Sequence, residues 1–406
     1  MKNKPVFPIK SSPLDTIPKD WENKTIGDVV EFSGGSQPPQ KVFIYEEKKG
    51  YIRLIQTRDY RTNRYKTYIP EKDARKQCSE NDIMIGRYGP PIFQIFRGLK
   101  GAYNVALIKA TPTNKINKEY CYYFLTRPEL RSYLEGLSQR SGGQTGVEMD
   151  RLNEYPFPLP SLSEQKTIAA CLNTWDEAIQ NIKSLIVQKE QRKKWLIHML
   201  LSGKKRLKGF GGKLKKVHIS DVAEEISIKN NTDKQLTVLS CTKYDGLVPS
   251  LEYFGRKIFS DDVSTYKIVP KNHFAYATNH IEEGSIGYQS IFDEALISPM
   301  YTVFKTDKSI NDVFFFKLLK SHYLIHEYNA RMEGSIDRRG GLRWDAFSII
   351  KVTIPPLEEQ IAIASVLQAA DNEIQLLEDK RDKLKEQKKG LMQVLLTGKK
   401  RLKVNL

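Results

Sequence analysis

Leu200-Leu-Ser-Gly-Lys-Lys-Arg-Leu-Lys208 and Leu395-Leu-Thr-Gly-Lys-Lys-Arg-Leu-Lys403 are two copies of one sequence, and they begin 195 residues apart. Upstream, Pro160-Ser-Leu-Ser-Glu-Gln165 and Pro355-Pro-Leu-Glu-Glu-Gln360 stand at the same offset. The segments between these anchors therefore align without a gap. A repeat at a fixed offset indicates a structural unit that is present twice.

Apolar residues between the anchors recur at alternating spacings of four and three. The first copy has Ile168, Leu172, Trp175, Ile179, Ile182 and Ile186, and the second has Ile363, Leu367, Ala370, Ile374, Leu377, Leu384 and Leu391. This period is typical of a coiled-coil seam. Lys189 and Arg381 interrupt the seam. We expect them to help fix the register of an antiparallel pair, with solvent exposure near a frayed end as the alternative.

Start and stop signals limit both helices. Ser161-x-x-Glu164 can form a capping box, and the second copy has prolines at its entry instead. Gly203 and Gly398 stand where a C-terminal cap belongs. Residues 164–201 would form a rod of roughly 57 Å at 1.5 Å per residue.

The segment before each helix has the pattern of a mixed domain. Short alternating runs predict strands at Tyr51–Gln56, Asp82–Ile85, Leu236–Leu239 and Tyr301–Phe304, and a single helical stretch follows in each domain, at Lys118–Leu137 and Asn311–Met332. We predict an α+β fold in which two globular domains, each a mixed β-sheet with helices, are separated by two long helices that pair as an antiparallel coiled coil. The expected ranges of this internal pseudo-two-fold duplication are 1–158 and 209–353 for the domains and 159–208 and 354–406 for the helices.

Composition points to a polyanionic partner. The 65 Lys and Arg residues against 48 Asp and Glu give a formal charge of +17, which favours nucleic acid, although anionic membranes and acidic proteins compete. The chain has no apolar run long enough to span a bilayer and no secretory signal, so we expect a cytoplasmic protein without a membrane partner. The four cysteines are far apart, which favours free thiols over disulfides or a zinc site.

Polar, glycine-bounded loops supply candidate DNA contacts. Arginine suits guanine, asparagine and glutamine suit adenine, and glycine lets the backbone approach a phosphate. The candidates are Arg87 and Tyr88; Arg140, Ser141, Gln144 and Thr145; Thr278 and Asn279; Arg338, Arg339 and Arg343; and Lys204, Lys205 and Arg206 in a glycine-rich linker. Ordinary solvated turns and a flexible hinge are the alternatives.

The sequence predicts no catalytic residue and no metal site. An adenine methyltransferase would need an Asp/Asn-Pro-Pro-Tyr/Phe loop, and the nearest strings, Tyr88-Gly-Pro-Pro91 and Ser298-Pro-Met-Tyr301, lack the amide or carboxylate. His322 and His326 stand four apart without the Glu of a zinc-protease motif. Glu282 and Glu283 are better interpreted as a solvated turn than as a magnesium site.

The repeated helix starts and ends, with two dissimilar domains before two similar helices, resemble the specificity subunits of type I restriction systems. Asp82-Ile-Met-Ile-Gly-Arg-Tyr-Gly89 and Ala102-Tyr-Asn-Val-Ala-Leu107 also resemble the first target recognition domain of that family. The resemblance implies that each domain binds one half of a bipartite site in double-stranded DNA through the major groove. It also implies that the helical pair sets the gap between the halves.

The same resemblance implies partners and cofactors. Two methyltransferase subunits would dock along the helices that carry Ile168, Leu172, Trp175, Ile179, Ile363, Leu367, Ile374 and Leu377, and restriction subunits would then join. S-adenosylmethionine, ATP and magnesium would serve the assembled complex, with no cofactor bound by this chain. A stand-alone duplicated DNA-binding protein and a coiled-coil adaptor are the alternative interpretations.

Overall fold

Two long helices run through a chain that divides into two units. The structure, a computed structural model, describes residues 17–138, 146–231, 235–333 and 341–403. Unit 1 comprises Met1–Ile182 with Lys380–Leu406, and unit 2 comprises Lys183–Asp379. Helices α5 (Leu162–Leu201) and α10 (Leu357–Leu395) each contribute one half to each unit. Each unit therefore contains one globular domain and half of each long helix.

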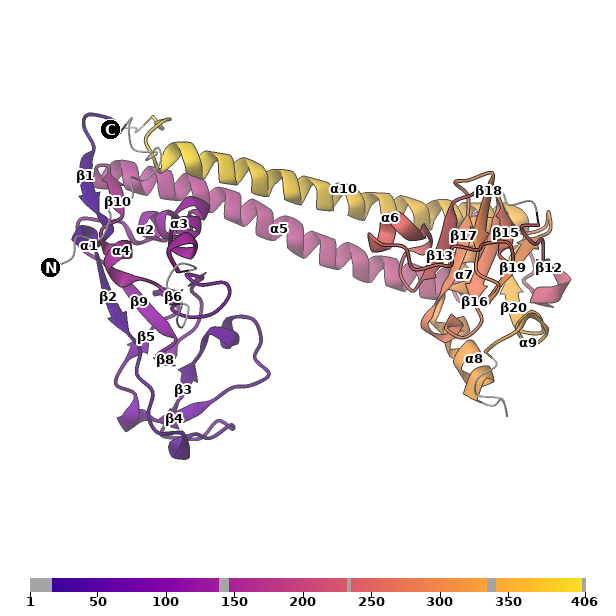
Figure 1. The fold of residues 1–406 in the computed structure, drawn as a ribbon, viewed down its shortest axis with the longest axis horizontal. Coiled ribbons are helices and arrows are strands. Elements are labelled where there is room, and N and C mark those ends of the chain that lie inside the picture. The colour runs from indigo at the N-terminus through magenta and orange to yellow at the C-terminus, as the bar shows by residue number, and fades with distance from the viewer. Residues whose placement is uncertain (1–16, 139–145, 232–234, 334–340, 404–406) are drawn as a thin grey trace. The chain divides into compact units, whose positions relative to one another are not determined.

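Unit 1 is built on three antiparallel or mixed sheets (Figure 1). The first has the strand order β2 (Val30–Gly34), β9 (Leu107–Pro112), β6 (Ile83–Gly86), β7 (Ile95–Phe96). The second has the order β4 (Tyr68–Pro70), β3 (Tyr51–Ile55), β8 (Gly101–Tyr103), β5 (Gln77–Cys78), with β3 and β8 parallel. A two-stranded sheet joins β1 (Glu22–Thr25) to β10 (Pro156–Leu159).

Unit 2 repeats this topology. Its first sheet has the order β12 (Ala223–Ile226), β19 (Tyr301–Thr306), β16 (His273–Ala277), β17 (Ile286–Gln289). Its second has the order β14 (Gly246–Pro249), β13 (Val238–Thr242), β18 (Glu294–Ile297), β15 (Lys267–Pro270), again with one parallel pair, β13 and β18. Strands β11 (Lys215–His218) and β20 (Lys351–Ile354) form the small sheet. The predicted α+β fold and the internal duplication are confirmed.

The single helical stretch predicted in each domain is wrong, because each is two helices. Unit 1 has α2 (Lys118–Leu125) and α3 (Pro128–Ser138), and unit 2 has α7 (Asp312–Leu319) and α8 (His322–Glu333). Pro128 lacks the N–H that would continue α2, so a new helix starts there. The shorter helices are α1 (Ile26–Val29) and α4 (Met149–Asn153) in unit 1, and α6 (Ser250–Phe254) and α9 (Trp344–Ser348) in unit 2.

In each unit the two long helices pack antiparallel, as predicted. In unit 1, Ile168 and Leu172 near the start of α5 share a core with Leu395 at the end of α10. In unit 2, Leu200 near the end of α5 shares a core with Leu367 near the start of α10. The predicted seam residues are buried or half-buried against their own chain: Ile168, Leu172, Trp175, Ile179, Ile363, Leu367, Ile374 and Leu377. These side chains are therefore covered, wholly or in part, by the chain itself.

A buried glutamate connects the two repeated segments, those at the helix starts and those at the helix ends. Glu164 at the start of α5 accepts hydrogen bonds from Arg401 Nε (2.8 Å) and Nη2 (2.7 Å), and from Trp21 Nε1 (3.0 Å). In unit 2, Glu359 at the start of α10 accepts the same pair of bonds from Arg206, with Nε at 2.7 Å. Each repeated helix start is thus bound by the repeated basic end of the other helix through a bidentate arginine.

The glutamine that follows each glutamate bonds the start of its helix to two backbone groups. Gln165 Oε1 accepts from the backbone N–H of Asn117 (2.7 Å), and its Nε2 donates to Pro160 O (2.8 Å). Gln360 makes the equivalent bonds to Asn311 N (2.9 Å) and Pro355 O (3.0 Å). One amide thereby joins the helix start to the loop before α2 or α7.

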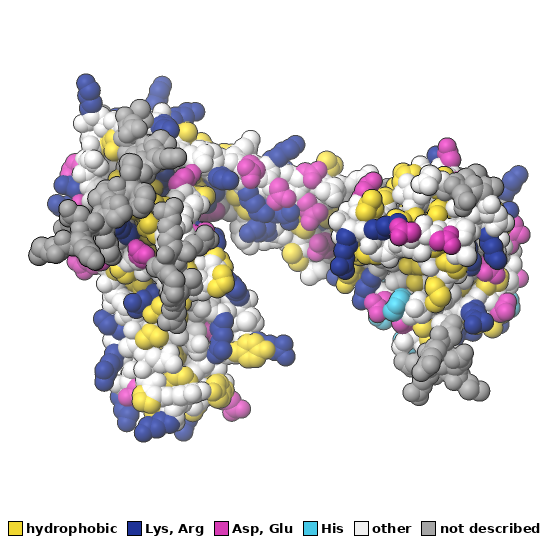
Figure 2. All heavy atoms as spheres, in the orientation of Figure 1, with side chains coloured by type: hydrophobic (Ala, Val, Ile, Leu, Met, Phe, Trp, Pro, Cys, Tyr) yellow, Lys and Arg dark blue, Asp and Glu magenta, His cyan; other side chains and the backbone are white. Residues whose placement is uncertain are grey.

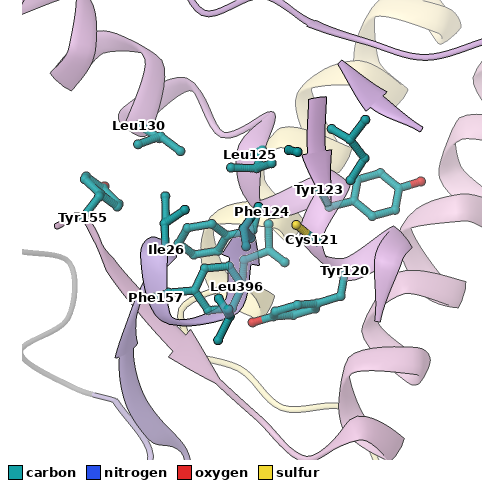
Figure 3. Packing of buried hydrophobic residues seen from close by; sticks show 14 of the residues in the cluster. Ile26, Tyr120, Cys121, Tyr123, Phe124, Leu125, Leu130, Tyr155, Phe157 and Leu396 are labelled. Carbon is teal, nitrogen blue, oxygen red and sulfur yellow. The ribbon is translucent and has the colours of Figure 1, made fainter. Parts of the chain in front are cut away.

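The helix ends also follow the sequence signals. Ser161 Oγ accepts from the Glu164 N–H (3.3 Å), which is half of the predicted capping box. Gly203 and Gly398 have φ of +69° and +72°, the left-handed conformation that glycine tolerates at a helix end. Beyond α10, Leu396 is fully buried in unit 1 beside Phe157 and Tyr120, as Figure 3 shows. The C-terminal segment is therefore part of the first domain's core.

Candidate nucleic-acid interface

The first predicted cluster lies where β6 ends. Arg87 and Tyr88 follow Gly86 and are half-buried, with the Arg87 guanidinium 5.2 Å from the centroid of the Tyr88 ring. The Arg87 carbonyl accepts from Val147 N (3.0 Å), and Tyr88 forms a β-bridge with Gly146. This turn therefore lies beside Gly146 and Val147. The predicted contacts Arg140, Ser141, Gln144 and Thr145 lie outside the described residues.

The predicted cluster of unit 2 occupies the equivalent position. Thr278 follows β16, and its carbonyl accepts from Leu342 N (2.7 Å), as that of Arg87 does from Val147. Asn279 and Arg343 are exposed. Arg338 and Arg339 lie outside the described residues. Two clusters that were proposed from unlike sequences thus stand at one topological site.

Thr278 and Arg343 line a groove of about 420 Å³ together with Lys267, Tyr301 and Trp344. Lys267 Nζ donates to the Tyr301 carbonyl (2.6 Å), and burial lowers the pKa of this lysine. The groove combines a hydroxyl, a guanidinium and an indole, which are groups that can bond or stack on bases, with the carboxylates of Glu225 and Asp345.

The three basic linker residues already have partners within unit 2. Arg206 binds Glu359, which raises the pKa of the arginine, and Lys205 Nζ lies 4.8 Å from the centroid of the Trp195 ring. Lys204 Nζ lies 3.4 Å from His198 Nε2. The predicted phosphate contact by these residues stays a prediction. Arg206 also has a structural role, because it binds Glu359 at the start of α10.

The sequence did not reveal a polar groove that lies beside the connection between β3 and β4. Residues 56–67 connect these strands and line a groove of about 720 Å³ that includes Arg58, Arg64 and Tyr65. In Figure 2, Lys and Arg side chains gather over the end of unit 1 that carries β3 and β4. The run Arg58 to Lys66 holds four basic residues with two tyrosines among them, and that signal could have indicated the segment.

Cys78 and Cys241 have thiols with raised pKa values. Burial raises the pKa of the Cys78 thiol to about 11 and that of Cys241 to about 12, so both stay protonated at neutral pH. In the described residues, His280, Glu282 and Glu283 place ligand atoms within 4.8 Å of one another. Their side chains are exposed or half-buried, and no further feature of this turn points to an ion.

In the described parts of the chain, no helix combines the length and apolar character needed to cross a membrane.

The chain is similar to known proteins over nearly its whole length. The family model described as "Type I restriction modification DNA specificity domain" matches residues 18–191 and again residues 212–386. The type I restriction enzyme MjaVIII specificity subunit of Methanocaldococcus jannaschii is 29% identical, over 95% of this chain and 94% of its own. The MjaIX specificity subunit of the same organism is 31% identical over 43% of this chain and 42% of its own.

Solved structures share the fold at low sequence identity. The S subunit of a type I restriction-modification system from M. genitalium has a TM-score of 0.53 at 16% identity, covering 94% of this chain and 96% of its own. The HsdS subunit from Thermoanaerobacter tengcongensis has a TM-score of 0.54 at 15% identity, with coverage of 94% and 98%. With both of its units matched by the family model, this chain belongs to the type I restriction-modification DNA specificity domain family.

Proposed function

We propose that this protein is the DNA sequence-specificity subunit of a type I restriction-modification complex. Each unit would read one half of a bipartite site in double-stranded DNA. One observation carries this proposal: both units have the same strand order, but the connections between their strands differ. Two readers of different base sequences need the same frame and different contact loops.

Charge supports the polyanionic partner. A formal charge of +17 favours a polyanionic partner such as DNA, and the family match favours DNA among the anionic partners that charge alone allows. Each phosphate neutralised would contribute about 0.9 to the slope of log K against log salt. Binding by this chain should therefore weaken steeply as salt rises.

The long helices would set the gap and hold other subunits. Their seam residues are occupied within the chain, so two methyltransferase subunits would dock on the outer faces. These faces expose Trp195 (46%), Ile361 (48%) and Leu376 (68%). Restriction subunits would complete the complex, which would work in the cytoplasm. S-adenosylmethionine, ATP and magnesium would act in those subunits, and this chain would select the site without chemistry of its own.

The test is to express the chain with a candidate methyltransferase subunit, in a host without adenine methylation, and to map methylated adenines across the genome. A motif of two defined halves with an unread gap is the expected result. Methylation without a bipartite motif, or a chain that stays alone beside that subunit, would count against the proposal. Sequence-blind binding of the assembled complex over a salt series would favour the coiled-coil adaptor instead.

A further inference from the structure

Equivalent hairpins in the two units end in different connections. In unit 1, β3 and β4 are joined by residues 56–67, and in unit 2 the equivalent strands β13 and β14 are joined by residues 243–245. The strand that begins each hairpin also pairs in parallel with the next strand of its sheet. The two connections therefore occupy one place in the topology while differing in length and sequence.

Both connections carry an exposed tyrosine beside a cation. Tyr65 is 53% exposed, with the guanidinium carbons of Arg58 and Arg64 at 5.9 and 5.5 Å from its ring centroid. Tyr244 is 82% exposed, with Lys243 Nζ at 5.6 Å. Folding favours burial of such rings, so an exposed ring paired with a cation at the same point in two divergent domains suggests a ligand surface.

The chemistry of the unit 1 groove suits base edges. Besides Tyr65, it is lined by the two arginines and by four side-chain amides, those of Gln37, Gln40, Gln56 and Asn63. Among the described lining residues there is no carboxylate, so the groove does not repel phosphate. Guanidinium and amide groups are those that bond guanine and adenine bidentately in the major groove.

Contacts of Asp59 and Tyr60 anchor the loop that presents these groups. Asp59 is buried, accepts from the Gln56 N–H (2.7 Å) and lies 3.5 Å from Arg53 Nη2. Tyr60 stacks on Phe96 with centroids 4.5 Å apart and planes 9° apart. A supported loop can place its outer side chains reproducibly on a base edge.

The two arginines have different roles within the loop. Arg58 Nη2 donates to the Tyr65 carbonyl (3.4 Å), which ties the connection to itself. In the described part of the chain, the Arg64 guanidinium contacts the Tyr65 ring and donates no hydrogen bond to another residue. Arg58 is therefore suited to positioning, and Arg64 retains its full set of donors for a partner.

We infer that these connections are the points at which the two units read bases, with Arg64 contacting a guanine in one half-site. Lys243 and Tyr244 would take the equivalent place in the other half-site. This inference rests on the proposed function and deepens it, because it names the residues that determine specificity.

The test uses the full chain with its methyltransferase subunit and maps methylated adenines for each variant. Arg64→Ala should relax one base pair in one half-site by about tenfold or more, since a bidentate contact discriminates at that level, and should leave the other half unchanged. Arg64→Lys keeps the charge and should relax the same base pair while methylation continues. Lys243→Ala with Tyr244→Ala should alter the opposite half. Arg75→Ala, at another exposed arginine of unit 1, is the matched control and should return the original motif.

An unchanged motif in Arg64→Ala would overturn the inference. So would weaker methylation of an unaltered motif, because that result identifies a phosphate contact. A wild-type chain that yields no bipartite motif would instead refute the proposed function, and the two failures are thereby separated. Thermal melting of each variant checks that its units remain folded.

Discussion

Lys388 Nζ lies 2.6 Å from Asp176 Oδ1, and this ion pair is repeated 195 residues away in the pair of Lys193 with Asp371. The first joins α10 to α5 in unit 1, and the second joins α5 to α10 in unit 2. Both lysines occupy positions in the heptad seam, where apolar residues would be expected. Each unit therefore contains a polar contact that only one register of the helices satisfies.

Replacing Lys388 by alanine should destabilise unit 1 by about 1.5–2 kcal/mol, because its ammonium group also lies 4.8 Å from the Tyr123 ring centroid. Hydrogen exchange of peptides from each unit in the full chain would locate the loss. Lys389→Ala, at the exposed neighbouring residue, should have little effect. Equal losses for the two variants would show that the seam lysine adds nothing specific.

Stability of unit 2 should depend on pH through Asp371. Burial acts to raise the pKa of this carboxyl, but hydrogen bonds from Lys193 and Lys317 hold it below its usual range. A lowered pKa in the folded state means that the stabilisation is complete above about pH 4 and is lost as pH falls through the folded value.

Asp371→Asn should therefore be less stable than the wild type at pH 7, by about 1.5 kcal/mol, and the difference should shrink in acid. Urea unfolding of both proteins between pH 7 and pH 2.5 measures it. Glu252→Gln removes an exposed carboxylate of the same unit as a control. A constant difference across the series would contradict the assignment.

Glu164→Ala should leave the Trp21 indole without its acceptor and the Arg401 guanidinium bonded only to Asp20, so we expect a loss of about 2–3 kcal/mol. This lies at or below the low end for a broken buried pair because Arg401 is 43% exposed. The emission of Trp21 should shift as its ring is freed. Glu359→Ala should destabilise unit 2 instead. Glu358→Ala, at an exposed position, should be close to neutral, and a similar loss there would argue against the buried pair.

Removing one heptad from both long helices should shorten the unread gap. Deleting residues 180–186 and 375–381 keeps the seam phase and shortens each helix by about 10 Å, which is about three base pairs of DNA. These deletions leave the anchoring pairs Asp176–Lys388 and Lys189–Glu373 in place. Methylation mapping measures the new gap. An unaltered spacing would refute the proposal that helix length sets the gap. Deletion from one helix alone should disrupt the pairing.

The sequence predicted the long helices well because their pattern is local and occurs twice. Heptad spacing reports which residues face a partner, and the partner helix is encoded in the same chain. The break between α2 and α3 was missed, although Pro128 marks it, because the apolar pattern continues through it. The equivalent break in unit 2 lacks a proline, and its local signal is Ser321, whose Oγ accepts from the Leu324 N–H (3.4 Å) at the start of α8.

The positions of the candidate loops could be compared with the structure, while their contact with DNA stays a prediction. A glycine-bounded turn indicated Arg87, the end of a predicted strand indicated Thr278, and the structure places both at one topological site. The groove beside Tyr65 was missed, because its lining comes from segments around residues 37–45 and 56–67 that are separate in sequence.

By itself, the sequence determined the duplication, the seam and the ends of the two long helices, since periodicity and capping act between residues a few positions apart. Only the tertiary structure decided that Arg401 binds Glu164 across 237 residues, and that the chain after α10 completes the core of unit 1. Such contacts depend on how the strands order and pack, and no local pattern of residues specifies which distant groups will meet.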